Sequence, residues 1–100
     1  MVKYFKIFNK NLPGIASGAR RVVGHVVDNN VWVLDPTTLK QAHITLNQWK
    51  DLSPSEVQYN AFELLNTIER NLKHHRQTSF VVWVRTELMK EAKQNAKKTK

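Results

Sequence analysis

The chain has 100 residues, of which 41% are hydrophobic and nine are aromatic, so it can bury the core of one globular domain. It contains no cysteine, which excludes disulfides, thiolate catalysis and cysteine-ligated zinc. Sixteen Lys and Arg against eight Asp and Glu leave a net charge of +8, and no apolar run approaches the roughly 20 residues that a membrane span needs. Because a cysteine-free chain is typical of a reducing compartment, we expect a cytoplasmic protein, in the host cytoplasm if it is viral.

The first twenty residues predict one strand and one loop. Aromatic and aliphatic residues alternate with lysine over residues 3–9, which is the period of a short strand. Residues 9–19 collect Asn, Pro, Gly and small side chains, which is typical of a loop. The segment 13–21 ends on Arg20 and Arg21, and its small residues would let a backbone approach a phosphate closely. No Gly-Lys-Ser/Thr follows it, so a flexible connector is the simpler interpretation.

Residues 21–46 predict a β-meander. Segments rich in apolar and β-branched residues are the expected strands, and they cover residues 22–27, 31–34 and 41–46. Asp28, Asn29 and Asn30 tolerate the left-handed backbone that a tight hairpin requires. Asp35 followed by Pro36 predicts a type I turn over residues 35–38.

The next segment predicts an amphipathic helix over residues 54–75. Residues 53–56 read Ser-Pro-Ser-Glu, which matches a capping box with proline at the first helical position. Leu52 and Val57 stand where a hydrophobic staple would place them. Apolar residues then recur along one face: Val57, Ala61, Leu64, Leu65, Ile68 and Leu72. We expect this face to pack on the sheet.

The C-terminal residues predict a strand and a basic helix. Residues 78–85 are apolar on both faces of an alternating pattern, which indicates a central strand. Residues 87–96 are strong helix formers with a thin apolar stripe, so we expect a frayed helix there.

The predicted order is therefore β-β-β-β-α-β-α, an α+β fold. Its mostly antiparallel sheet would be covered by one amphipathic helix and followed by a basic C-terminal helix or tail. A meander curled into a small barrel is the alternative. We expect a single domain over residues 1–86 and a basic, partly helical or disordered tail over residues 87–100.

The charge is sorted along the chain. Residues 1–21 carry five cations and no acid, residues 22–69 carry two cations against six acids, and residues 70–100 carry nine cations against two acids. Basic ends attract polyanions, and nucleic acid is the commonest polyanion in a cell. The candidate phosphate contacts are Arg20, Arg21, Arg70, Lys73, Arg76, Arg85, Lys90, Lys93, Lys97 and Lys98. A solvated tail that only aids solubility is the competing interpretation.

Aromatic rings are candidates for stacking on bases or for anchoring a protein partner. Trp32 and Trp83 fall in apolar predicted strands, so we assign both to the core. Trp49 precedes the predicted helix beside a lysine, and it is the tryptophan expected to be partly exposed. Tyr59 and Phe62 lie just off the apolar stripe of that helix. The candidates for stacking or partner contact are therefore Trp49, Tyr59 and Phe62.

No pattern predicts a catalytic residue, a metal site or a cofactor. His74 and His75 are adjacent, so on a helix they would point about 100° apart and could not easily chelate one ion. His25 and His43 could meet across the meander, but the spacing implies no third ligand. The carboxylates are scattered among turns, a cap and a helix surface. A small metal-independent ribonuclease stays a minor alternative, because phosphodiester cleavage needs only an acid, a base and cations.

Two functions from different classes fit these features. The first is a small nucleic-acid-binding protein that contacts phosphates through a basic patch and the C-terminal tail, with DNA and RNA equally compatible. The alternative is a small adaptor or inhibitor, of the kind that viruses encode, docking on an acidic host protein without nucleic-acid contact. A homodimer that buries Tyr59 and Phe62 would also use the exposed rings. Neither function involves a membrane.

Overall fold

The computed structural model describes residues 2–7, 20–74 and 77–98, except for the side chains of Arg20, His74 and residues 95–98. The elements are β1 (Lys3–Ile7), β2 (Arg20–Val27), β3 (Asn30–Leu34), β4 (Gln41–Thr45), α1 (Leu46–Asp51), β5 (Ser55–Val57), α2 (Ala61–Asn71), the 3₁₀ turn η1 (Leu72–His74) and α3 (Ser79–Lys98). The loop predicted at residues 9–19 lies outside the described residues.

The strands form one antiparallel sheet in the order β4-β3-β2-β1-β5. The predicted strand at the N-terminus and the three strands of the meander are confirmed, as is the α+β fold class. Within the described residues the sheet does not close on itself, because β4 and β5 are its two edges. The alternative of a small closed barrel is therefore wrong.

The turns of the meander follow from local chemistry. Asp28 adopts φ 56° in the two-residue connection between β2 and β3, the left-handed conformation that Asp tolerates. At the next turn, Oδ1 of Asp35 accepts hydrogen bonds from the backbone N–H of Thr37 (2.9 Å) and Thr38 (3.4 Å). These bonds stabilise a turn at the predicted place, but its backbone closes one residue later than in a type I turn, because the N–H of Leu39 donates to the carbonyl of Asp35 (2.7 Å).

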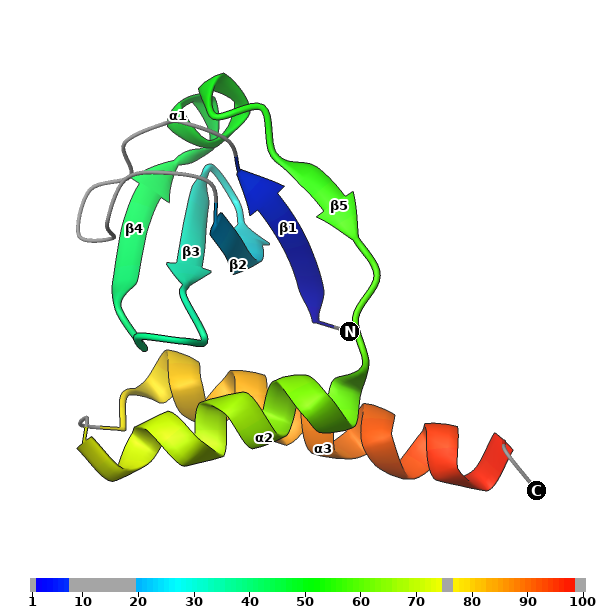
Figure 1. Cartoon of the computed structure of the whole chain (residues 1–100). Coiled ribbons are helices and arrows are strands. Elements are labelled where there is room, and N and C mark those ends of the chain that lie inside the picture. Colours follow the sequence, from blue (N-terminus) through cyan, green and yellow to red (C-terminus); the bar gives the residue numbers. More distant parts are fainter. Residues whose placement is uncertain (1, 8–19, 75–76, 99–100) are drawn as a thin grey trace.

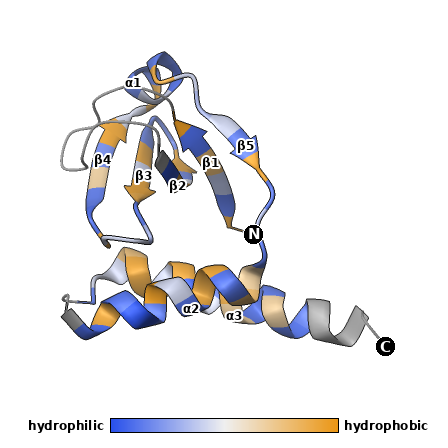
Figure 2. Ribbon diagram, viewed as in Figure 1, coloured by the Kyte–Doolittle hydropathy of each residue, from blue (hydrophilic) through white to orange (hydrophobic). Residues whose placement is uncertain are grey.

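Each face of the sheet carries its own hydrophobic core. Val22 and Val33 point to one face, where Trp49 of α1 covers them. Val23 and Leu34, their immediate neighbours in the strands, point to the opposite face, where α2 and α3 pack. Figure 1 shows α1 above the strands and the α2–α3 hairpin below them. Hydrophobic residues in Figure 2 concentrate in the strands and along the parts of α2 and α3 beneath them.

The predicted helix over residues 54–75 is wrong in its first part. Ser55–Val57 pair with β1 as β5, because the second edge of β1 is satisfied by backbone hydrogen bonds from this segment. The helix begins only at Ala61, where the Asn60 side chain accepts a hydrogen bond from the N–H of Glu63 (3.1 Å). The capping box that does form lies upstream, between Thr45 and Gln48 at the start of α1. The apolar stripe of the predicted helix is retained in α2.

The predicted strand at residues 78–85 is wrong, because these residues begin helix α3. Val81, Val84 and Leu88 are fully buried, whereas Val82 is 41% exposed, which is the spacing of a helical face rather than of a strand. The hydroxyl of Thr78 accepts a hydrogen bond from the N–H of Val81 (3.3 Å) at the start of this helix. α3 continues past residue 86 without interruption, so two helices cover the sheet in place of the single one expected.

Candidate functional site

A row of three rings crosses the sheet on the face that the helices cover. His25 of β2 is the register partner of Trp32 in β3, and Trp32 is the partner of His43 in β4. Directly paired residues of neighbouring strands share a face, so the three side chains project together. The imidazole of His43 stacks on the indole of Trp32 with centroids 4.3 Å apart and planes 22° apart. The two histidines thus flank Trp32 and do not meet.

The first turns of α3 add two rings to this row. Trp83 stacks on His25 with centroids 4.1 Å apart, and Phe80 lies 5.8 Å from Trp32 and 6.2 Å from Trp83. We call these five residues, His25, Trp32, His43, Phe80 and Trp83, the aromatic cluster. Phe80 is buried at its centre, whereas His43 is exposed and the other three are half-buried. The start of α3 is therefore docked on the sheet through rings rather than aliphatic side chains alone.

The aromatic cluster is open at one side. A shallow pocket of about 140 Å³ is lined by His25, Trp32, Phe80 and Trp83, together with Ser79. Half-buried indoles beside a pocket leave part of their π faces accessible, and a planar ring gains most by stacking on such faces. The hydroxyl of Ser79 adds one hydrogen-bonding group to a lining that is otherwise aromatic. The pocket is therefore small and lined mainly by aromatic rings.

Two exposed lysines of α3 follow the aromatic cluster along the helix. Lys90 lies seven residues after Trp83, which is nearly two helical turns, so the two side chains share a face of the helix. Thr86 and Lys93 lie on the adjacent part of the same face, and both lysines are exposed. Lys97 lies one turn beyond Lys93 on the helix backbone. We call Lys90 and Lys93 the lysine pair of α3.

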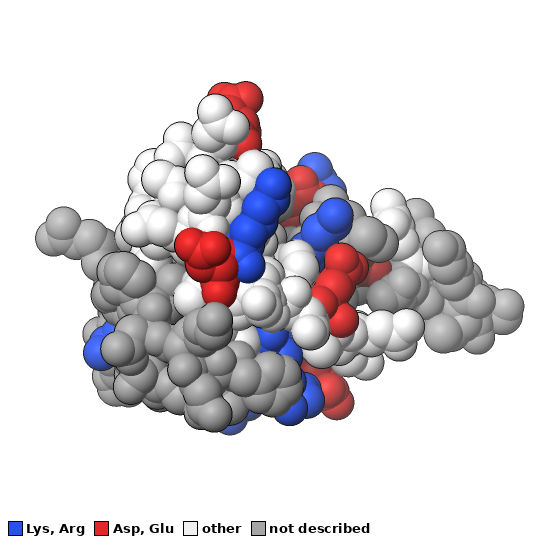
Figure 3. Space-filling model, turned by 90° about the horizontal axis from the view of Figure 1, so that it is seen from above, with Lys and Arg blue, Asp and Glu red and all other residues white. Residues whose placement is uncertain are grey.

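The predicted basic residues of the described part of the chain lie on several different elements. Arg21 is exposed at the start of β2, and Arg70 and Lys73 are exposed on α2 and η1. On the face seen in Figure 3, Lys and Arg side chains are interspersed with Asp and Glu. The side chains of Arg20, Arg76, Lys97 and Lys98 lie outside the described residues.

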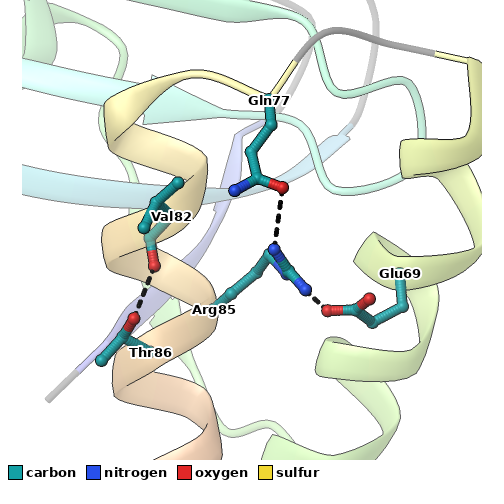
Figure 4. Close-up of polar contacts among 5 residues, drawn as sticks. All are labelled: Glu69, Gln77, Val82, Arg85 and Thr86. Carbon is teal, nitrogen blue, oxygen red and sulfur yellow. Dashed lines mark hydrogen bonds and ion pairs between the residues drawn. The ribbon is translucent and has the colours of Figure 1, made fainter.

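The side chain of Arg85 is hydrogen-bonded to two other residues of the chain. Its Nε donates to Oε1 of Glu69 on α2, and its Nη1 donates to Oε1 of Gln77, 2.9 Å away (Figure 4). The side chain of Arg85 is only 25% exposed, so a phosphate would have to compete with a charged partner that is already in place. Arg85 thus joins α2 to α3.

The three aromatic residues predicted to contact a partner have different environments. Trp49 is only 5% exposed, because its ring packs edge-to-face on Phe5, with centroids 5.1 Å apart, and against Gly24. The expectation that Trp49 is partly exposed is therefore wrong. Tyr59 is half-buried, and Phe62 is 63% exposed on the outer side of α2.

The hydroxyl of Tyr59 belongs to a polar contact that joins Val2 to α3 through the segment preceding α2. It lies 2.6 Å from the carbonyl oxygen of Val2 and 2.6 Å from Oε2 of Glu91, whose Oε1 accepts from the N–H of Val2 (3.2 Å). Burial and the neighbouring Glu91 carboxylate raise the pKa of Tyr59 well above its ordinary value. Tyr59 is therefore held as a neutral structural group.

Trp32 and Trp83 pack against the core, as the sequence predicts, but both are only half-buried and both line the pocket. A two-residue turn at Asp28 and Asn29 places His25 opposite Trp32, so the pairing of these two residues could be predicted from the hairpin register. The contribution of Trp83 was not readable, because residues 78–85 were interpreted as a strand.

Comparison with protein-family models, curated proteins and solved structures found no match for this chain. Among the described residues, no three His, Cys, Asp or Glu side chains are grouped so that they could hold a metal ion. In the same part of the chain, no helix combines the length and the apolar character needed to cross a membrane. The fold is an α+β domain, and the candidate site is the aromatic cluster with the lysine pair of α3.

Proposed function

We propose that the protein binds single-stranded nucleic acid, with bases stacking at the aromatic cluster and phosphates contacting the lysine pair of α3. The observation that supports this proposal best is the open stack of imidazole and indole rings, continuous along α3 with exposed lysines. Stacking is tolerant of sequence because every base has a π face, and cations along the strand neutralise phosphates.

The pocket favours a single strand over a duplex. Bases in a duplex are already stacked on each other, so their faces are accessible only when the strand is unpaired. A pocket of about 140 Å³ between rings suits one planar group and is too small for a paired and stacked step. The net charge of +8 adds long-range attraction for either nucleic acid.

The first test is the binding of a labelled strand of about ten nucleotides, as DNA, as RNA and as a duplex, at about 50 and 200 mM salt. We expect the single strands to bind more tightly than the duplex. Equal affinity for duplex and single strand would overturn the stacking contribution, because a duplex hides its base faces.

Point substitutions separate stacking from charge. Trp83→Ala should weaken single-strand binding by roughly 5- to 150-fold, the range for loss of one stacked base. His43→Ala removes an exposed ring whose loss leaves the core intact, and it should weaken binding in the same direction. Unchanged binding in both folded variants would exclude the aromatic cluster.

The lysine pair has a matched control. Replacing Lys90 and Lys93 by Gln should lower the slope of log affinity against log salt by about 1.4, if both contact phosphates. Lys40→Gln with Lys50→Gln changes the charge equally at exposed lysines elsewhere, and it should leave the slope unchanged. Equal effects of the two double variants would mean that only net charge matters. Deletion of residues 87–100 is unsuitable, because it would remove the buried Leu88.

A second candidate function is docking on an acidic protein through the outer side of α2. Phe62 is 63% exposed there, and Arg70 and Lys73 are exposed on the same helical face and the following turn. An exposed aromatic ring beside cations is a common anchor at interfaces. Phe62→Ser should abolish such docking while leaving nucleic-acid binding unchanged, and light scattering of the wild type would reveal a homodimer that buries Phe62.

A further inference from the structure

A second and larger cleft lies beside α2, on the same face of the sheet as the aromatic cluster. It has a volume of about 280 Å³ and separates the first two turns of α2 from Tyr4 of β1 and Arg21 of β2. Leu64 forms its buried base, and Tyr4 and Tyr59 form aromatic walls. We call this space the tyrosine cleft.

The aromatic walls of the tyrosine cleft are held in place. The rings of Tyr4 and Tyr59 meet edge-to-face with centroids 6.0 Å apart and planes 78° apart. The Tyr59 hydroxyl is hydrogen-bonded to Val2 and Glu91, which restrains the ring. Burial raises the pKa of Tyr4 above its ordinary value. The cleft is thus formed before a ligand binds, and binding would not need to order these two side chains.

Two opposite charges line the opening. Arg21 and Glu63 both border the tyrosine cleft and both are exposed. The hydrogen bonds and ion pairs found among the described residues use neither side chain, since Glu63 takes part only through its backbone. Arg21 can only donate hydrogen bonds, and the Glu63 carboxylate can only accept them. A ligand that satisfies both must offer acceptors at one place and donors at another.

The need for both donors and acceptors excludes a simple anion as the ligand and distinguishes between the nucleic-acid bases. A phosphate or carboxylate would suit Arg21, but Glu63 would repel it. Guanine presents two adjacent N–H donors, N1–H and N2–H, that match the two oxygens of a carboxylate. It also presents the O6 and N7 acceptors that pair with Arg. Adenine and uracil lack two adjacent donors, and cytosine offers a single amino group.

We infer that the tyrosine cleft binds a guanine base, with Glu63 accepting from N1–H and N2–H and Arg21 donating to O6 and N7. The inference goes beyond the proposed function, because a free guanine nucleotide would supply the same base as a nucleic-acid strand. The tyrosine walls provide contact with the ring, and Glu63 provides the selection against the other bases.

The test is calorimetric titration of the full chain with GMP, AMP, CMP and UMP, and with guanosine and inorganic phosphate. We expect GMP and guanosine to bind similarly and at least about ten-fold more tightly than the other three nucleotides. Equal binding of the four nucleotides, or binding of phosphate as tight as that of GMP, would overturn the inference.

Glu63→Gln keeps the length of the side chain but removes one of the two paired acceptors, so GMP affinity should fall about ten-fold. Glu56→Gln is the matched control, because Glu56 is exposed on β5 and does not line the tyrosine cleft. A thermal melt of each variant checks that the fold is retained. A folded Glu63→Gln variant that binds GMP like the wild type would refute the role of the carboxylate.

The source of the base is decided by competition. A strand of about ten uridines with one central guanine should displace GMP if the cleft serves a nucleic acid, and the all-uridine strand should not. If neither strand displaces GMP, the ligand is the free nucleotide. Trp83→Ala should retain GMP binding even where it loses strand binding, so a failure of the proposed function and a failure of this inference give different results.

Discussion

Gly24→Ala tests how tightly the core beneath Trp49 is packed. A Cβ atom at this position would lie 2.9 Å from both Cη2 and Cζ2 of Trp49 and 3.1 Å from Cδ1 of Phe5. The Trp49 ring is only 5% exposed and rests edge-to-face on Phe5, so it has no open space into which it could move.

The contacts around Gly24 predict that Gly24→Ala lowers the stability of the fold. In a strand free of contacts, replacing glycine by alanine would stabilise the fold by about 0.5–1 kcal/mol. Overpacking of a filled core costs about 1–3 kcal/mol, so we expect a net loss of about 1–2 kcal/mol. For a domain of this size the melting temperature should fall by roughly 5–10 °C. Urea and thermal unfolding followed by circular dichroism measure both values.

A double-mutant cycle isolates the cause. Trp49→Phe removes the two indole atoms that the new methyl group would strike, so Gly24→Ala should cost less in the Trp49→Phe background than in the wild type. An equal loss of stability in the two backgrounds would refute the packing argument, and so would a stabilised Gly24→Ala variant.

Two further predictions concern the polar contacts around the helices. Tyr59→Phe should lower stability at neutral pH by about 1–2 kcal/mol, because the contact with the Glu91 carboxylate is lost. Because the pKa of Tyr59 is raised in the folded state, its contribution to stability is complete below about pH 10 and is lost as the pH rises above that value. Chemical denaturation at increasing pH should therefore show a smaller loss of stability in the variant than in the wild type. The part of the loss that is due to Tyr4 should remain in both. Arg85→Gln should lower the free energy of unfolding by about 0.5–1 kcal/mol, because solvent screens the partly exposed pair with Glu69. The variant should bind nucleic acid as tightly as the wild type. A weakened affinity with normal stability would instead make Arg85 a phosphate contact.

Local signals predicted the meander well. The turns need particular residues at particular positions, and Asp28 and Asp35 supply them without help from distant parts of the chain. The apolar stripe of α2 was also readable, since Ala61, Leu64 and Ile68 are buried at helical spacing.

Signals that depend on a distant partner were misread. Residues 55–57 have a good capping pattern, but β1 offers them a strand edge, and pairing there prevails over local helix initiation. The predicted order of element types still matched as far as α2, although the first helix and the fifth strand are formed by other residues. A correct order therefore did not mean that each element was correctly located.

The candidate site shows the same division. The basic residues could be named from composition, but only the structure shows that Arg85 is paired with Glu69 and that Arg21 lines the tyrosine cleft. Register could place His25 beside Trp32, but only the docking of α3 brings Trp83 onto that row.

The sequence alone determined the net charge, the meander with its turns and the apolar face of α2, because charge is additive and turn and periodicity signals act within a few residues. Only the tertiary structure decided that residues 78–85 are helical, that Trp49 is buried and that rings from β2, β3, β4 and α3 form one cluster. A short apolar run fits the period of a strand or of a helix, and the surface against which it packs selects between them.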